Sequence, residues 1–278
     1  MDLSGKLMLA PMAGITDVAF RSICVDHGAD ITVTELVSAE SILRHNEKTG
    51  VLLKRYPNET CFGIQLFGSD PARMAKAAEA VESRCDFIDI NMGCPAPNVY
   101  LAGAGSALLN TPGLAGDIIR HVSEAVSIPV SVKIRLGITD SSEALPVAKA
   151  CERAGASWIT VHGRTRKQGY AGIADWVTIE HVKNELSIPV IGNGDIASPE
   201  DLRNAFHQYG VDAIAIGRAA SGNPWIFGTA KSLLATGSYT SPSLYDRLSV
   251  FETYLERARE CNVPFLNQKL QAQHFMKG

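Results

Sequence analysis

Cys94 stands between Gly93 and Pro95, directly after an apolar run that begins at Phe87. A thiol with its ordinary pKa of about 8.5 is mostly protonated at neutral pH, so it can donate a proton, or act as a nucleophile once a base has removed that proton. The base that strand order brings nearest is His162. The sequence therefore predicts a reactive thiol at position 94 and leaves its role open between proton donor and nucleophile.

The remaining five cysteines are interpreted as small, buried hydrophobic residues. No C-x-x-C pair occurs, and no histidine lies at the spacing of zinc ligands beside Cys24, Cys61, Cys85, Cys151 or Cys261. Scattered thiols of this kind suit a reducing cytosol better than a disulfide framework. We therefore expect a cytoplasmic protein without a metal site.

Lys133 lies between Val132 and Ile134 in a run that reads as a buried strand. A buried ammonium without a partner is costly, so the side chain needs an anionic neighbour. One candidate is the pyrimidine portion of a reduced flavin ring lying across the mouth of a barrel. The other is a structural ion pair with a strand carboxylate such as Glu35 or Asp89, and the spacing does not decide between them.

Two glycine-rich segments indicate a phosphate site. Gly192-Asn193-Gly194-Asp195 and Gly217-Arg218 offer unobstructed backbone N–H groups and a guanidinium that can grip phosphate oxygens. They could instead be tight turns beside a surface arginine. Phosphate binding is favoured because both follow the last two strand candidates, where α/β barrels often bind phosphate.

These residues need a scaffold, and short apolar runs alternate with helix-period segments along the chain. Eight strand candidates begin at Leu7, Ile31, Cys61, Phe87, Pro129, Trp158, Pro189 and Ala213. Helix candidates between them include residues 71–81, 113–126, 144–154 and 199–209. Eight such units predict an α/β fold, a (β/α)8 TIM barrel. A doubly wound sheet is the alternative, but no G-x-G-x-x-G follows the first strand, and residues 103–106 read as a flexible loop.

In such a barrel the reacting groups lie at the C-terminal ends of the strands and in the loops that follow. Nearly every expected strand end carries a polar or cationic group, or an unusual turn. In chain order they are Pro11, Met12, Ala13, Gln65, Asn91, Cys94, Lys133, Arg135, His162, Arg164, Arg166, Asn193, Gly194, Asp195, Gly217 and Arg218. A lone polar group at a strand end is more often structural, but this many together predict one site.

The composition gives no global attraction to nucleic acid or membrane. The 278 residues are 46% apolar and 20% charged, with a net charge of −3, so a polyanion would have to be held by a local patch. No apolar run reaches the roughly 18 residues of a membrane span. We expect no membrane association, and no obligate protein partner is evident.

The composition and the periodicity of the sequence change after Gly237. Residues 238–243 form a polar linker, and apolar residues then recur at helical spacing from Leu244. We expect a barrel over residues 1–237 and a small helical segment over 238–278. That segment ends directly after an apolar pair, as an incomplete helical unit would.

Taken together, these motifs resemble the tRNA-dihydrouridine synthase family. The matching pieces cover about residues 7–230, in order: APMAGITD from Ala10, VTELV from Val33, QLFG from Gln65, DINMGCP from Asp89, GAGSALL from Gly103, VKIRLG from Val132, TVHGRTR from Thr160, GNGDI from Gly192 and AIGRAA from Ala215.

The resemblance implies an FMN enzyme that uses NADPH to saturate the 5,6 double bond of particular uridines in tRNA. It implies hydride transfer from flavin N5 to C6 of the uracil and proton transfer from Cys94 to C5, which selects the proton-donor role. The target uridine would leave the tRNA stack and enter the barrel mouth.

It also implies roles for the other residues. Cofactor contacts would come from Pro11, Met12, Ala13, Gln65, Lys133, His162, Asn193, Gly194, Asp195, Gly217 and Arg218. The uridine and the tRNA would be met by Asn91, Arg135, Arg164 and Arg166.

Two features depart from the family pattern. The loop after Cys94, residues 96–101, has no lysine or arginine, and the helical segment is short and of mixed charge. Both weaken the expectation of tRNA docking at those places. Two alternatives therefore stay open: an FMN barrel that reduces a free pyrimidine or another small enone, and an RNA-binding protein that has kept the fold but lost turnover.

Overall fold

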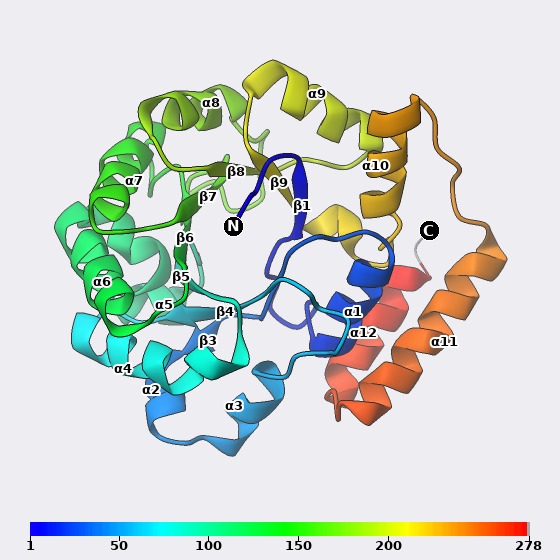
Figure 1. Ribbon diagram of the computed structural model, residues 1–278, viewed down its shortest axis with the longest axis horizontal. Helices are drawn as coiled ribbons and strands as arrows, with labels where there is room; N and C mark the ends of the chain where they lie inside the picture. Colours follow the sequence, from blue (N-terminus) through cyan, green and yellow to red (C-terminus); the bar gives the residue numbers. More distant parts are fainter. Residues whose placement is uncertain (277–278) are drawn as a thin grey trace.

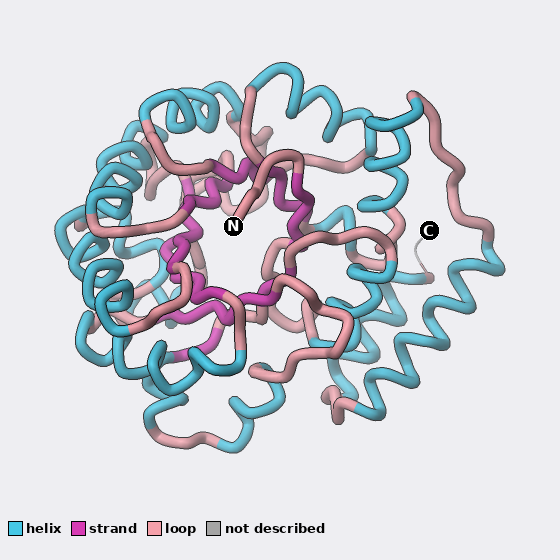
Figure 2. The backbone as a smooth tube through the Cα atoms, viewed as in Figure 1, coloured by secondary structure: helices cyan, strands magenta, loops and turns pink. Residues whose placement is uncertain are grey.

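In the computed structural model, which describes residues 1–276, parallel strands form a ring that is surrounded by helices (Figures 1 and 2). The strands are β1 (Lys6–Leu9), β2 (Thr32–Val33), β3 (Val37–Ser38), β4 (Phe62–Phe67), β5 (Phe87–Met92), β6 (Val130–Arg135), β7 (Trp158–His162), β8 (Val190–Asn193) and β9 (Ala213–Ile216). The sheet order runs β1-β9-β8-β7-β6-β5-β4-β2. A parallel bridge between Met8 and Ile31 links its two ends, so the predicted (β/α)8 barrel is confirmed.

The second expected strand differs from the prediction because it is broken into two pieces. Both β2 and β3 pair with β4, and residues 34–36 lie between the two strands, although Thr34 N still donates to the Gly63 carbonyl at 3.0 Å. Thr34 turns its hydroxyl toward the sheet and accepts a hydrogen bond from Gln65 N at 3.0 Å. Glu35, the next residue, lies in this break, and its carboxylate accepts from Gly14 N at 2.6 Å, which matters below.

Helices cover the outside of the ring. They are α1 (Val18–Asp26), α2 (Ala39–Leu43), α3 (Glu47–Leu52), α4 (Pro71–Val81), α5 (Pro97–Leu101), α6 (Pro112–Ala125), α7 (Ala144–Arg153), α8 (Trp176–Glu185), α9 (Pro199–Tyr209), α10 (Ile226–Thr236), α11 (Leu244–Glu260) and α12 (Phe265–Phe275). The four predicted helices are present to within one residue at each end. Asp70 and Ser198 cap two of them ahead of a proline, as the sequence indicates. Residues 105–110 form a 3-10 helix, so the loop expected there extends less far.

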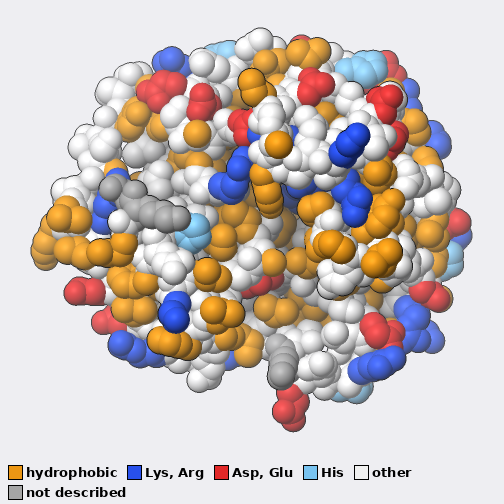
Figure 3. All heavy atoms as spheres, turned by 180° about the vertical axis from the view of Figure 1, so that it is seen from behind, with side chains coloured by type: hydrophobic (Ala, Val, Ile, Leu, Met, Phe, Trp, Pro, Cys, Tyr) orange, Lys and Arg blue, Asp and Glu red, His pale blue; other side chains and the backbone are white. Residues whose placement is uncertain are grey.

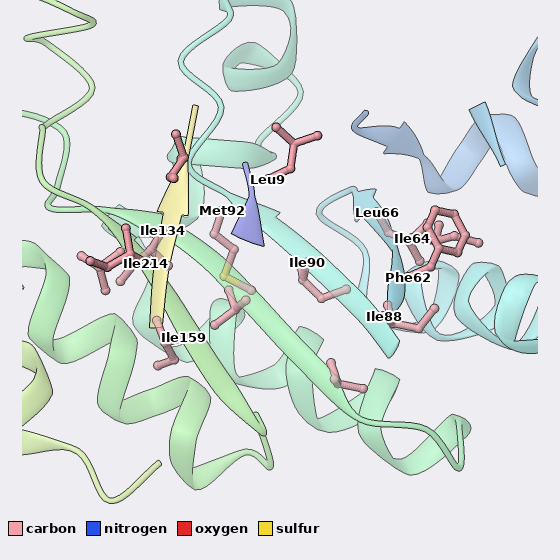
Figure 4. Packing of buried hydrophobic residues seen from close by; sticks show 14 of the residues in the cluster. Leu9, Phe62, Ile64, Leu66, Ile88, Ile90, Met92, Ile134, Ile159 and Ile214 are labelled. Carbon is pink, nitrogen blue, oxygen red and sulfur yellow. The ribbon is translucent and has the colours of Figure 1, made fainter. Parts of the chain in front are cut away.

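Two apolar clusters follow from the alternation of side chains along each strand. Outward residues such as Ile64, Ile88 and Ile159 pack between the strands and the helices (Figure 4). Inward residues near the strand starts fill the barrel, where the rings of Phe87 and Trp158 meet at 4.9 Å. The N-terminal end of the barrel is therefore sealed by apolar packing, and polar groups gather at the other end.

The C-terminal helices lie against one side of the barrel. In Figure 1 α11 (orange) and α12 (red) stand next to α1. Phe275 packs edge-on against Phe20 of α1 at 6.5 Å, and Tyr254 of α11 is fully buried. The predicted end of this segment, residues 277–278, lies outside the described residues. Within residues 1–276, no helix is long and apolar enough to cross a membrane.

Candidate active site

A cavity of about 700 Å³ opens at the C-terminal ends of the strands. Its lining includes, of the predicted site residues, Pro11, Met12, Ala13, Gln65, Asn91, Cys94, Lys133, Arg135, His162, Asn193, Gly194, Asp195, Gly217 and Arg218. Figure 3 views the molecule from this end, and Lys and Arg side chains are grouped near the centre of the face. Arg164 and Arg166 do not line the cavity. The barrel therefore brings together almost all the residues that the sequence singled out.

Cys94 is half-buried at the cavity wall, and its backbone is held on both sides. Its N–H donates to Asn91 Oδ1 at 2.9 Å. Its carbonyl accepts from Ser106 N at 3.1 Å and from Ser106 Oγ at 2.8 Å. The motif around Ser106 thus fixes the loop that carries the thiol, a role that the sequence interpretation missed.

The other cysteines differ from Cys94 in their surroundings. Cys24, Cys85 and Cys151 are buried, and burial raises the pKa of the thiols of Cys85 and Cys151 to about 12. Cys61 is half-buried, and its pKa is raised to about 11, mainly by burial. The raised pKa values keep these thiols protonated at neutral pH, which agrees with a packing role.

A chain of buried side chains runs from the barrel interior to the thiol loop. Asp89 accepts from Ser131 Oγ and from Gln65 Nε2, each at 2.6 Å. Gln65 Oε1 accepts from Asn91 Nδ2 at 2.8 Å, which leaves Asn91 Oδ1 to accept from Cys94 N. Because a carboxylate only accepts, Asp89 fixes which way each amide points. Asp89 was weighed from the sequence only as a partner of Lys133.

Lys133 donates to Asn193 Oδ1 at 3.2 Å. Burial, followed by the neighbouring Arg135, lowers the pKa of its ammonium to about 8. Neither carboxylate considered as an ion-pair partner pairs with it in residues 1–276, since Asp89 bonds Gln65 and Glu35 accepts from Gly14 N. An ammonium has three donors, so Lys133 keeps hydrogen-bonding capacity for a group in the cavity.

His162 is a neutral side chain at pH 7. Burial lowers its pKa to about 2, and the charges of Lys133, Arg135, Arg164 and Arg218 add to the effect. Such a weak base is poorly suited to removing a proton from a thiol. His162 is therefore a poor candidate for the base that a nucleophilic thiol would need.

The predicted phosphate end is built on backbone that only glycine adopts easily. Gly194 has φ +132°, and a Cβ there would come within 2.7 Å of Ala174 Cβ. Asp195 beside it accepts from Arg164 at 2.8 Å and from Arg218 at 3.2 Å. Although partial burial raises its pKa, these contacts and a backbone N–H hold the pKa of this carboxyl below its usual range.

The arginines that were expected to meet tRNA lie in different surroundings. Arg135 and Arg164 are only 3% and 2% exposed. Arg135 donates to three loop carbonyls, and Arg164 donates to two more and to Asp195, so both hold the loop after β7. Arg166 is half-buried, and its guanidinium carbon lies 3.7 Å from the centre of the Tyr100 ring. Their contact with tRNA stays a prediction.

Tyr170 completes the rim of the cavity. Tyr170 is 61% exposed, and its ring lies 4.8 Å from the Arg218 guanidinium and 5.8 Å from that of Arg135.

Within residues 1–276 no cluster of histidine, cysteine and carboxylate side chains could hold a metal ion.

Comparison with known proteins agrees with this arrangement. The family model described as dihydrouridine synthase matches residues 8–277. The tRNA-dihydrouridine synthase B of Pasteurella multocida is 41% identical over 93% of this chain and 79% of its own length. The protein of the same name from Pseudomonas aeruginosa is 45% identical over 85% of this chain and 72% of its own.

More distant solved structures share the fold. A histamine dehydrogenase from Rhizobium sp. 4-9 superposes with a TM-score of 0.62 at 14% identity, over 84% of this chain and 46% of that one. A 2-naphthoyl-CoA reductase superposes with a TM-score of 0.65 at 11% identity, over 82% of this chain and 50% of that one. At such identities the likeness shows the barrel alone.

Proposed function

This chain belongs to the dihydrouridine synthase family, and we propose that it reduces particular uridines of tRNA to dihydrouridine with bound FMN and with NADPH as the reductant. The observation that carries the proposal is a cation-lined cavity with one fixed thiol on its wall. An activity on tRNA would take place in the cytoplasm.

The cavity fits an anionic, planar cofactor. Among residues 1–276 the cations around His162 face few carboxylates, chiefly Asp195, with Asp89 acting on Lys133, so a phosphate would relieve the excess positive charge. Asn193, Gly194, Gly217 and Arg218 would hold that phosphate. The ring would lie on Pro11, Met12 and Ala13, with Gln65 and Lys133 at its edge and His162 beside it.

The chemistry that bound FMN supplies is hydride transfer to C6 of the uracil. The protein then has to supply a proton to C5, and the Cys94 thiol stands on the cavity wall where it could donate one. Asn91 and Ser106 hold the loop so that the thiol keeps its position. Asn91 would also lie near the uracil, although both ends of its amide already have partners.

Access to a base in folded RNA requires that the uridine leave its stack. The rim offers Tyr170 and Arg218, an aromatic ring and an exposed guanidinium, and the exposed Lys167 lies nearby in sequence. The loop after Cys94, residues 96–101, has no lysine or arginine. Its Tyr100 ring, however, packs against the guanidinium of Arg166 from the loop after β7. This contact supports a local positive patch for phosphates where the family's basic stretch is missing.

The proposal is tested with the purified full chain. It should be yellow or become so with FMN, NADPH should bleach the flavin, and tRNA lacking dihydrouridine should gain it. A preparation that never binds FMN would contradict the cofactor assignment. Bleaching by NADPH with dihydrouracil formed from free uracil, but no dihydrouridine formed in tRNA, would favour the small-enone alternative.

A further inference from the structure

The loop of residues 11–16, here called the cavity loop, has two faces. Pro11, Met12 and Ala13 line the cavity. Its other side lies against α12, where Gln271 Nε2 donates to the Ile15 carbonyl at 2.7 Å. Gly14 has φ +76°, and a Cβ there would lie 3.4 Å from Leu270 of the same helix. The C-terminal helices therefore touch the back of the loop whose front faces the proposed flavin.

Glu35 forms a second link between α12 and the cavity loop. One carboxylate oxygen accepts from Gly14 N at 2.6 Å, and the other accepts from Asn267 Nδ2 at 3.4 Å. The side chain is only 8% exposed, and burial raises its pKa. Burying a carboxylate is costly unless hydrogen bonds satisfy it, and here Gly14 and Asn267 supply them. Glu35 lies in the break between β2 and β3.

The C-terminal end of the cavity loop is also held by hydrogen bonds. Thr16 Oγ1 accepts from Met12 N at 3.0 Å, and the Thr16 carbonyl accepts from the buried Arg21 at 3.0 Å. The next residue, Asp17, caps α1 and accepts from the hydroxyl of Tyr254 in α11 at 3.1 Å. Both C-terminal helices thus donate hydrogen bonds to the cavity loop or to the carboxylates that hold it.

We infer that the C-terminal helices position the cavity loop for the cofactor, with Gln271, Glu35 and Asn267 as positioning residues. The inference rests on the proposed function, because it takes the front of the loop to be the flavin floor. It gives the helical segment a task besides any docking of tRNA. A loop held in its bound geometry binds its ligand with less loss of conformational freedom.

The coupling has to be reciprocal. If the helices favour the loop conformation that binds FMN, then bound FMN must favour the docked conformation of the helices by the same factor. Substituting a side chain that only stabilises the fold would lower the melting temperature of the protein without changing the FMN affinity of the folded state. Two measurements therefore distinguish positioning of the loop from simple stabilisation of the fold: the affinity for FMN, and the effect of bound FMN on the stability of α12.

The main test compares two glutamines of α12. Gln271→Met removes the donor to Ile15, and Gln273→Met is the matched control, since Gln273 is exposed on the same helix. FMN dissociation constants are measured by fluorescence titration without tRNA. A net hydrogen bond is worth about 1 kcal/mol, so Gln271→Met should weaken FMN binding about fivefold and the control should not.

Glu35 offers an independent pair of variants. Glu35→Leu removes the acceptor of the Gly14 N–H and should weaken FMN binding about tenfold. Glu35→Gln keeps an oxygen for Gly14, and the Asn267 amide can turn to suit it, so binding should return to near the natural value. If Glu35→Leu does not fold, the Gln271 pair still decides.

Hydrogen exchange of α12 supplies the mirror measurement. Saturating FMN should slow amide exchange over residues 265–275 in the natural protein, and this slowing should shrink in Gln271→Met. Natural protein that binds FMN, with unchanged affinity in both Gln271→Met and Glu35→Leu, would overturn the inference alone. Natural protein that does not bind FMN would overturn the proposed function and the inference with it.

Discussion

Two buried polar regions lie on opposite sides of the cavity loop. The pKa values of their titratable groups are shifted in opposite directions. In front, burial and neighbouring cations lower the pKa of Lys133 to about 8 and that of His162 to about 2. Behind, burial raises the pKa of Asp17 to about 6 and also raises that of Glu35. The cavity loop thus has mainly cationic side chains in front of it, and behind it two buried carboxylates with Arg21 nearby.

The two regions differ in how their charges are satisfied. The carboxylates behind the loop accept hydrogen bonds from the backbone and from Tyr254 and Asn267, so the protein itself completes them. The cations in front have few anionic partners in residues 1–276, chiefly Asp195. Incomplete neutralisation in a cavity is typical of a ligand site, and complete hydrogen bonding is typical of structure.

The largest expected effect breaks the chemistry of the front region. Cys94→Ala removes the proposed proton donor, and general acid catalysis of this kind contributes about 100-fold or more. We expect flavin content and reduction by NADPH to persist while single-turnover formation of dihydrouridine falls by at least that factor. Full activity of the variant would remove Cys94 from the mechanism, and Cys151→Ala, a buried thiol outside the cavity, is the control.

Lys133→Met tests whether the front cations await a ligand. The pKa of Lys133 in the fold is about 8, below its ordinary value of 10.5, so the buried charge costs stability at pH 7. This cost is fully present below pH 8, falls as pH rises from 8, and is gone only above 10.5. The FMN-free variant should gain on the order of 2 kcal/mol in unfolding free energy at pH 7. FMN binding should weaken at the same time. A variant that is less stable without FMN would argue that Lys133 is structural.

Variants of Asp89 test whether this buried carboxylate orients the amides of Gln65 and Asn91 in the region in front of the loop. Asp89→Leu frees the amides of Gln65 and Asn91 to turn, and we expect dihydrouridine formation to slow about tenfold, since an unmade buried hydrogen bond costs about 1–3 kcal/mol. Asp89→Asn should be close to normal because the Ser131 hydroxyl can accept as well as donate. Equal rates in the two variants would show that orientation of the amides is unimportant.

The smallest expected effect concerns the region behind the loop. Because the pKa of Asp17 is about 6 in the fold and 3.8 as the ordinary value, its contribution to stability is present below pH 3.8 and is lost as pH rises through 6. Asp17→Asn keeps a cap and should raise the unfolding free energy at pH 7 by roughly 1 kcal/mol. Denaturation curves at pH 4 and pH 7 check this. A gain of equal size at both values would contradict the titration.

The sequence by itself determined the barrel and most of the polar residues of its cavity, but not Tyr170, and it included Arg164 and Arg166, which lie outside the cavity lining. Helices such as α4 and α9 are specified by local spacing and caps, and buried strands by local apolar runs, so both can be read from neighbouring residues. The cavity residues follow from a geometric rule, because parallel strands end on one face. Lys133 and Cys94 were identified for this reason.

Only the tertiary structure decided the partners. Asn267 donates to Glu35 across 232 positions of the chain, and no local pattern encodes such a pair. The same holds for the burial of Arg164 against Asp195 and for the break that separates β2 from β3. Periodicity depends on neighbours in sequence, whereas a buried polar group takes whichever partner the closed barrel and its helices bring within hydrogen-bonding distance.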